Sequence, residues 1–203
     1  HNFVYPKSVV VKSSQFSFSI LLGADPVLRV EMSSTGEVAC FGSDYDEALL
    51  KSILSANKFD FSKKAVLFSI GGQVSKAKFL EAARAIRSLG YTIFATNRTA
   101  SFFKNNGIVC QVARKAHEKV PTVIDIIEGK KVSFVVNLSE AKESRDGIKE
   151  KNLTTDGYKI RRATVDNQIP LFTDMHLARA FIKALSRYDI KDLQIKSYNE
   201  YIN

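Results

Sequence analysis

From residue 65 onward the sequence alternates short apolar runs with amphipathic stretches, and this alternation constrains the fold more than any other feature. Apolar runs of strand length occur at 65–70, 91–95, 108–112, 132–136 and 170–173. Helical patterns follow them at 75–89, 99–106, 122–128, 154–167 and 174–187. Short apolar strands that alternate with helices are typical of βαβ units, whose parallel strands are covered on both faces. The sequence therefore predicts an α/β, Rossmann-like fold with a five-stranded parallel sheet and helices on both faces.

Residues before this region are organised differently. They hold a strand-like run at 9–11, a strand-like alternation of polar and aromatic residues at 13–19, and one amphipathic helix over 44–56. A segment of this size is not expected to bury enough apolar surface to fold alone. The change of pattern near residue 58 predicts a boundary between a partial domain over 1–58 and a complete domain over 59–203. The chain starts with His1 rather than Met, which favours numbering that begins inside a longer polypeptide.

Charge and cysteine content narrow the classes of function. Lys and Arg total 30 against 21 Asp and Glu, a net charge of +9 that attracts anions. The aromatic residues fall mostly at apolar positions and do not interleave with a basic stripe, so no nucleic acid partner is expected. No apolar run has the roughly 20 residues of a membrane span, and no signal peptide is visible. Cys40 and Cys110 lack disulfide or metal-ligand spacing, which predicts no metal site and favours a reducing, cytoplasmic location.

Polar residues gather where the predicted strands end. Ligands of open parallel sheets bind outside the carboxyl ends of the strands. The residues at these ends that suit an anion are Lys76, Thr96, Thr99, Lys115, Asn137 and Ser139. The two threonines bracket a helix start, whose N–H groups and dipole favour negative charge, and Asn137 offers a donor and an acceptor to a sugar or base. Together they predict a site for a phosphorylated small molecule.

Simpler interpretations exist for each residue alone. Thr96 and Thr99 could be helix caps, and Lys76 a solvated surface lysine. The adjacent Arg161 and Arg162 indicate an exposed basic helix, a pair that anchors the loop after the fourth strand, or a pair that helps to bind anions. The convergence of several residues on one sheet edge favours the binding site. No nucleophile elbow, Ser/His/Asp order, metal cluster or Walker loop occurs, so no catalytic residue is predicted.

Several motifs carry a resemblance to a known family. The run VEMSSTGEV at 30–38 and the run GADPV at 23–27 resemble the end of the second ATP-grasp half of carbamoyl phosphate synthetase large subunits. The run FATNRTA at 94–100 and the run DGYKIRR at 156–162 resemble the methylglyoxal-synthase-like regulatory domain that follows it. The resemblance covers nearly the whole chain. It implies an ATP-grasp remnant over 1–58 and a regulatory domain over 59–203.

The resemblance also implies a function as an allosteric effector-binding domain. The parent large subunit is an ATP-dependent ligase of pyrimidine and arginine biosynthesis, which uses ATP and Mg and works with a glutaminase subunit or domain. Its catalytic residues lie upstream, so the present residues are expected to be catalytically inert and to hold no cofactor. The implied effector is a nucleotide such as UMP, UTP or IMP. Its phosphate is expected to lie against Lys76, Thr96, Thr99 and Lys115, with Asn137 nearby.

Features of this chain bear on the effector and on the alternatives. Members that use N-acetylglutamate carry a Trp after the third strand and an Asn before the motif Tyr. This chain has no Trp and has Gly157 there, which favours a nucleotide. A methylglyoxal-synthase-type lyase shares the fold but needs an aspartate in the loop after the fourth strand, where the first acid is Glu140. A degenerate structural or oligomerisation module is the other alternative, which Arg98 would support if it filled the pocket. Otherwise Arg98 is expected, like the arginine pair, to add positive charge to the site.

Overall fold

The computed structural model describes residues 8–27, 34–114, 121–139 and 155–202. Its largest element is a five-stranded sheet in the order β5-β4-β3-β6-β7, in which every neighbouring pair is parallel. The strands are β3 (Ala65–Ile70), β4 (Thr92–Thr96), β5 (Gln111–Ala113), β6 (Phe134–Leu138) and β7 (Leu171–Phe172). The predicted α/β fold with a five-stranded parallel sheet is therefore confirmed.

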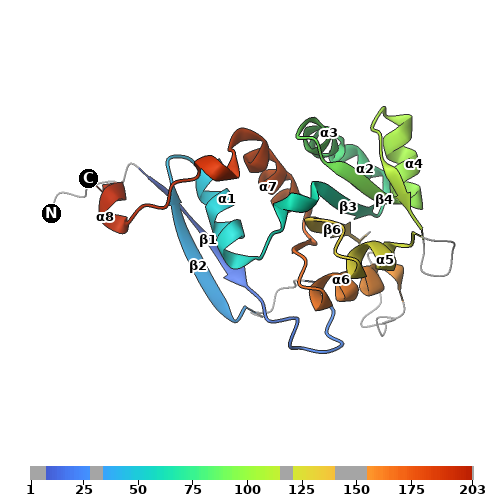
Figure 1. The fold of residues 1–203 in the computed structure, drawn as a ribbon, viewed down its shortest axis with the longest axis horizontal. Coiled ribbons are helices and arrows are strands. Elements are labelled where there is room, and N and C mark those ends of the chain that lie inside the picture. Colours follow the sequence, from blue (N-terminus) through green and yellow to red (C-terminus); the bar gives the residue numbers. More distant parts are fainter. Residues whose placement is uncertain (1–7, 28–33, 115–120, 140–154, 203) are drawn as a thin grey trace.

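Helices cover both faces of this sheet (Figure 1). One face packs against α3 (Leu80–Ser88), α4 (Asn97–Asn105) and α7 (Met175–Arg187), and the other against α5 (Val123–Glu128) and α6 (Asp156–Asp166). Side chains of a strand alternate between its faces. Val66 and Phe68 of β3 accordingly join the first core, whereas Ala65 and Leu67 join the second. Burial on both faces explains why the strands are continuous apolar runs.

The boundaries differ from the predicted ones in two places that matter for the site. The helix expected over 75–89 is divided at Phe79 into α2 (Gln73–Lys78) and α3. The fourth predicted strand runs two residues further than expected, so that Asn137 and Leu138 lie within β6 and pair with Ser69 and Ile70. The neighbouring strand β3 extends to Ile70. The hydrogen-bonded pairing of β3 with β6 therefore continues beyond residue 136, where the apolar run of the predicted fourth strand ends.

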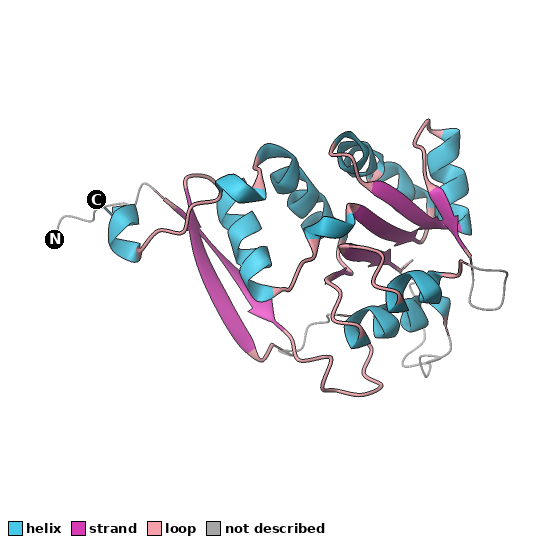
Figure 2. Ribbon diagram, viewed as in Figure 1, coloured by secondary structure: helices cyan, strands magenta, loops and turns pink. Residues whose placement is uncertain are grey.

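The segment before residue 58 forms a two-stranded antiparallel sheet and one helix (Figure 2). Strand β1 (Val9–Gln15) pairs with β2 (Gly36–Gly42), and the latter strand was not predicted. The strand-like pattern predicted over 13–19 is correct for residues 13–15, which end β1. Residues 16–19 instead enter a turn in which the Ile20 N–H donates to the Ser17 carbonyl. The predicted helix is α1 (Tyr45–Ala56), and its first turn is capped by the Asp44 carboxylate, which accepts from the Glu47 N–H.

Helix α1 lies between this small sheet and α7 (Figure 1). Leu49, Leu50 and Ile53 of α1 belong to the same buried cluster as Phe181 of α7. The segment before residue 58 thus shares its apolar core with the domain after it. The remaining elements are short: η1 (Phe61–Lys63), η2 (Ile190–Asp192) and α8 (Tyr198–Ile202). No helix in the described part of the chain has the length and hydropathy that a membrane span requires.

Candidate functional site

The two predicted threonines lie at the adjoining ends of β3 and β4, but they play different parts. The Thr99 hydroxyl accepts from the Ile70 N–H at 3.0 Å and from the Thr96 hydroxyl at 3.2 Å, and donates to the Ile70 carbonyl at 3.2 Å. A hydroxyl has one donor and two acceptor positions, so these three bonds use all of them. Thr99 is also fully buried. It therefore fastens the start of α4 to the end of β3, and its hydroxyl has no position left for a ligand.

Thr96 is the half-buried member of the pair. It occupies the N-cap position of α4, yet its side chain accepts no hydrogen bond from the first turn. Thr96 is therefore the N-cap residue by position, as predicted, but its hydroxyl does not make the capping hydrogen bond. Since no side chain of the described residues caps these N–H groups, the start of α4 offers the donors and the dipole that suit an anion.

Lys76 lies on α2, the helix that follows β3, and is only 5% exposed. Among the described residues, no acceptor lies within hydrogen-bonding distance of its ammonium group. The interpretation as a solvated surface lysine is therefore wrong. Its ammonium group is not among the buried nitrogens that lack a partner, so it reaches solvent, where a ligand phosphate would supply a compensating negative charge.

Asn137 lies at the carboxyl end of β6, where it is 3% exposed. Its Oδ1 accepts a hydrogen bond of 2.9 Å from Nη1 of Arg161. The same guanidinium donates from Nε and Nη2 to the two carboxylate oxygens of Asp25, both at 2.7 Å. Arg161 is 5% exposed, so the pair is buried at the sheet edge.

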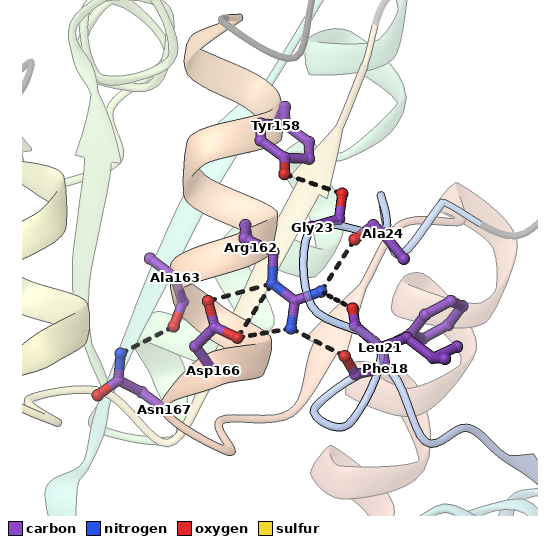
Figure 3. Close-up of polar contacts among 9 residues, drawn as sticks. All are labelled: Phe18, Leu21, Gly23, Ala24, Tyr158, Arg162, Ala163, Asp166 and Asn167. Carbon is purple, nitrogen blue, oxygen red and sulfur yellow. Dashed lines mark hydrogen bonds and ion pairs between the residues drawn. The ribbon is translucent and has the colours of Figure 1, made fainter.

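Arg162 contacts the backbone of the same N-terminal segment (Figure 3). Its guanidinium donates to the carbonyls of Phe18, Leu21 and Ala24 at 2.8 to 3.0 Å, and pairs with Asp166 one turn along α6. The arginine pair is not an exposed basic helix, because both side chains are buried against residues 18–25. Both positive charges face carboxylates, so neither adds free charge to the candidate site.

The other predicted residues are less informative. Ser139 is exposed just after β6, and Arg98 is exposed in the first turn of α4. The hypothesis of a degenerate structural or oligomerisation module required Arg98 to fill the pocket. The exposed position of Arg98 does not support that hypothesis. Lys115 and Glu140 lie outside the described residues.

Two residues of the site were not predicted as part of it. Asp25 was considered only as part of the run GADPV at 23–27, and nothing near it in the sequence indicates a partner 136 residues away. In the sequence, Gly157 served only to favour a nucleotide effector over N-acetylglutamate. In the structure, the absence of a side chain at this position leaves space for neighbouring atoms. A Cβ there would lie 3.1 Å from Nη1 of Arg161 and 3.8 Å from Oδ1 of Asn137.

Asp125, a carboxylate of α5 that lyase chemistry would need, is engaged in helix capping. Its Oδ2 accepts from both the N–H and the hydroxyl of Thr122. These hydrogen bonds hold the pKa of Asp125 below its ordinary value. A general base works best with a pKa near the working pH, so this carboxylate is poorly suited to proton abstraction.

A groove in the described part of the chain lies away from the carboxyl ends of β3, β4 and β6. It has a volume of about 560 Å³ and is open to solvent, between β1, α1 and the edge strand β7. Phe16, Phe18, Leu49, Ile53 and Phe172 supply much of its apolar lining. The candidate site instead rests on the polar residues of the strand ends, because the groove contains none of them. No cluster of three metal-ligating side chains occurs among the described residues.

Comparison with known proteins agrees with this architecture. Residues 78–173 match the family model of the MGS-like domain. The chain is 37% identical over 187 residues to the multifunctional protein CAD of Squalus acanthias, which covers 87% of this chain and 8% of that protein. It is 39% identical over 179 residues to the multifunctional protein pyr1-3 of Dictyostelium discoideum, covering 88% of this chain and 8% of the relative.

A carbamoyl phosphate synthase large chain is similar over an even larger share of the sequence. The large chain of Methanosarcina mazei is 36% identical over 197 residues, or 97% of this chain and 17% of its own length. The chain thus spans only a small part of the curated relatives it matches. With its five-stranded sheet and these matches, the chain belongs to the MGS-like domain family, in the form that occurs within carbamoyl phosphate synthase large chains and the related multifunctional proteins.

Proposed function

We propose that the chain is the regulatory part of a carbamoyl phosphate synthase large subunit and binds a phosphorylated nucleotide at the carboxyl ends of β3, β4 and β6. The observation that carries this proposal is the pairing of an uncapped helix start at Thr96 with a buried lysine, Lys76, that has no acceptor among the described residues. Both features favour a bound anion at one edge of the sheet.

In this proposal the phosphate lies at the start of α4. The first N–H groups of α4 donate to it, the Thr96 hydroxyl does so by turning its single hydrogen from Thr99 to the ligand, and Lys76 neutralises its charge. Lys115 adds a second positive charge, and Asn137 and Ser139 face the nucleoside. Thr99 acts indirectly, because its bonds to Ile70 set the position of the helix start.

The wider role follows the relatives. The remainder of a large subunit, with its ATP and magnesium sites, would carry the ligase chemistry, and a glutaminase subunit or domain would supply ammonia. The present residues would be noncatalytic and would act in the cytoplasm, in pyrimidine or arginine biosynthesis. Binding of the nucleotide would change the relative stability of two states of the parent enzyme.

Calorimetric titration of the 203-residue chain with UMP, UTP and IMP tests the proposal. We expect at least one nucleotide to bind, and Lys76→Ala and Thr96→Val each to raise its Kd about tenfold, since one charge-assisted hydrogen bond contributes about 1.4 kcal/mol or more. Lys191→Ala, a change of an exposed lysine in η2, is the matched control and should leave Kd unchanged. A folded chain that gives no heat with any of the three nucleotides would contradict the proposal.

A further inference from the structure

A continuous set of hydrogen bonds joins the sheet edge to the N-terminal segment. It runs from Oδ1 of Asn137 to the guanidinium of Arg161 and from there to both oxygens of Asp25. The Arg161 side chain is 7% exposed and that of Asp25 17% exposed, so solvent screens the pair little. Hydrogen bonds between ionised groups are shorter and stronger than neutral ones, and two parallel bonds also fix the orientation of the pair.

This arrangement settles which way the Asn137 amide points. An arginine has five N–H donors and no acceptor, so only the amide oxygen can face it. The Nδ2 group is then turned away from Arg161, and no acceptor for it occurs among the described residues. At this position the sheet edge therefore presents a donor to a ligand and not an acceptor.

The same guanidinium is held firmly from the other side. Its two bonds to Asp25 fix the plane of the guanidinium, and Gly157 leaves the space in which it lies. Arg162 binds three carbonyls of residues 18–25, so this segment contacts α6 at several points. Any movement of residues 18–25 away from α6 would release the Asp25 carboxylate from Arg161.

We propose that Arg161 is a positioning residue: it holds the Asn137 amide so that the nucleotide site presents an N–H donor, and it ties that orientation to residues 18–25. The inference rests on the proposed function and gives the ligand a defined chemistry. The group opposite Asn137 is a hydrogen-bond acceptor, such as a keto oxygen, a ring nitrogen or a ribose oxygen. A ligand acceptor on Nδ2 also polarises the amide and strengthens its bond to Arg161, so occupancy of the site stabilises the attached segment.

The first test separates the donor role of Asn137 from a structural one. Asn137→Asp keeps an acceptor for Arg161 and removes the donor that faces the ligand. We expect a Tm equal to or above that of the unsubstituted chain, and a Kd for the best-bound of UMP, UTP and IMP at least tenfold higher. Because the new carboxylate would also repel a phosphate, Asn137→Leu, which lacks both the donor and the charge, is the matched variant and should raise Kd as well. An Asn137→Asp chain that binds the nucleotide as tightly as the unsubstituted chain would overturn the assignment.

The second test follows the link to the N-terminal segment. The chain contains no Trp, so Phe18→Trp places a single fluorescent reporter in residues 18–25 and keeps an aromatic ring stacked on Phe16. Saturating nucleotide is expected to change its emission. Adding Asp25→Asn should abolish that change and raise Kd about threefold or more, because Arg161 is no longer held. Asp166→Asn is the matched control: it removes the partner of Arg162 and leaves the Arg161 bonds intact, so the change should persist.

Calorimetry on the same samples keeps the two proposals apart. Absence of heat from the unsubstituted chain with all three nucleotides would overturn the proposed function, and this inference with it. Heat accompanied by no emission change in the Phe18→Trp chain, or by an undiminished change in the Asp25→Asn variant, would overturn the role of Arg161 alone.

Discussion

At the scale of single residues, the position of Gly157 shows how closely the sheet edge and α6 approach each other. The atoms nearest to a Cβ added at this position belong to Arg161 and Asn137, so a methyl group would press on the bond between them. The residue lies in the first turn of α6, where an alanine would otherwise favour the helix by up to about 1 kcal/mol.

Gly157→Ala is therefore expected to weaken nucleotide binding without a large loss of stability. The guanidinium has to shift by a few tenths of an ångström, whereas the helix gains from alanine, and the two effects on stability oppose each other. We expect Kd to rise about three- to tenfold by calorimetry, with Tm changed by less than about 4 °C. Gly36→Ala is the matched control, since its added carbon meets only Gln15 Oε1 at 3.9 Å. An unchanged Kd would contradict the packing role of Gly157.

Individual site residues were predictable to different degrees. The ends of apolar strands can be identified from the sequence. This was sufficient to place Thr96, Thr99 and Asn137 at one edge of the sheet. The use of the Thr99 hydroxyl could not be foreseen, because its partner Ile70 is 29 residues away and bonds through its backbone. Burial of Lys76 and the pairing of Arg161 with Asp25 depend on tertiary packing in the same way.

At the scale of elements, the contact of α1 with α7 combines apolar packing with a buried carboxylate. Asp46 of α1 is 2% exposed and pairs with Lys183 and Arg187 of α7. Burial by itself raises the pKa of Asp46, but hydrogen bonds and charges from Arg187 and Lys183 outweigh it and hold the pKa below its ordinary value. The Asp44 carboxylate accepts from the Tyr188 hydroxyl at 2.8 Å and adds to the same contact.

Because the folded pKa of Asp46 is depressed, its stabilising effect is complete above the unfolded pKa of about 3.9 and is lost as pH falls through the folded value. Asp46→Asn is expected to lower the free energy of unfolding by about 2 kcal/mol at pH 7, and by less near pH 3. Urea denaturation followed by circular dichroism at both pH values measures the two differences. Asp192→Asn, at an exposed residue of η2, should change little at either pH. Equal losses at pH 7 and pH 3 for Asp46→Asn would contradict the ionic role.

Elements were predicted best where pattern alone determines them. The five strands of the parallel sheet and the helices between them are marked by apolar runs and amphipathic stretches of ordinary length. The division at Phe79 was not foreseen, because the amphipathic pattern continues through it. Strand β2 was missed because its burial alternates only over its first five residues, and because a long connection separates it from β1, the strand with which it pairs.

At the scale of the whole molecule, the apolar core does not stop at the predicted boundary near residue 58. The α1 side chains Leu49, Leu50 and Ile53 pack in one cluster with residues of β3, β6 and α7. A cluster of this kind couples the stability of its members, so the chain is expected to unfold as one cooperative unit.

Leu50→Ala tests that expectation, since Leu50 is fully buried in α1. We expect a loss of about 3 kcal/mol and a shift of the entire unfolding transition, because a cavity in the shared core affects both parts. Far-ultraviolet circular dichroism and tyrosine emission should report the same midpoint in urea. Leu177→Ala on α7, at a residue that is 39% exposed, should cost much less. A second transition that stays at its original midpoint in the Leu50→Ala chain would show that the two parts unfold separately.

The distance along the chain between Asp25 and Arg161 also sets the order of events during synthesis. They are separated by 136 residues. At about 5–20 residues per second, a ribosome needs roughly 7 to 27 s to go from the first to the second. Residues 18–25, in which Ile20 and Leu22 are exposed, therefore cannot form their hydrogen bonds to Arg161 and Arg162 until α6 has been made. The connection between the sheet edge and this segment therefore forms only after α6 has been made, and the contact of Arg187 with Asp46 comes later still.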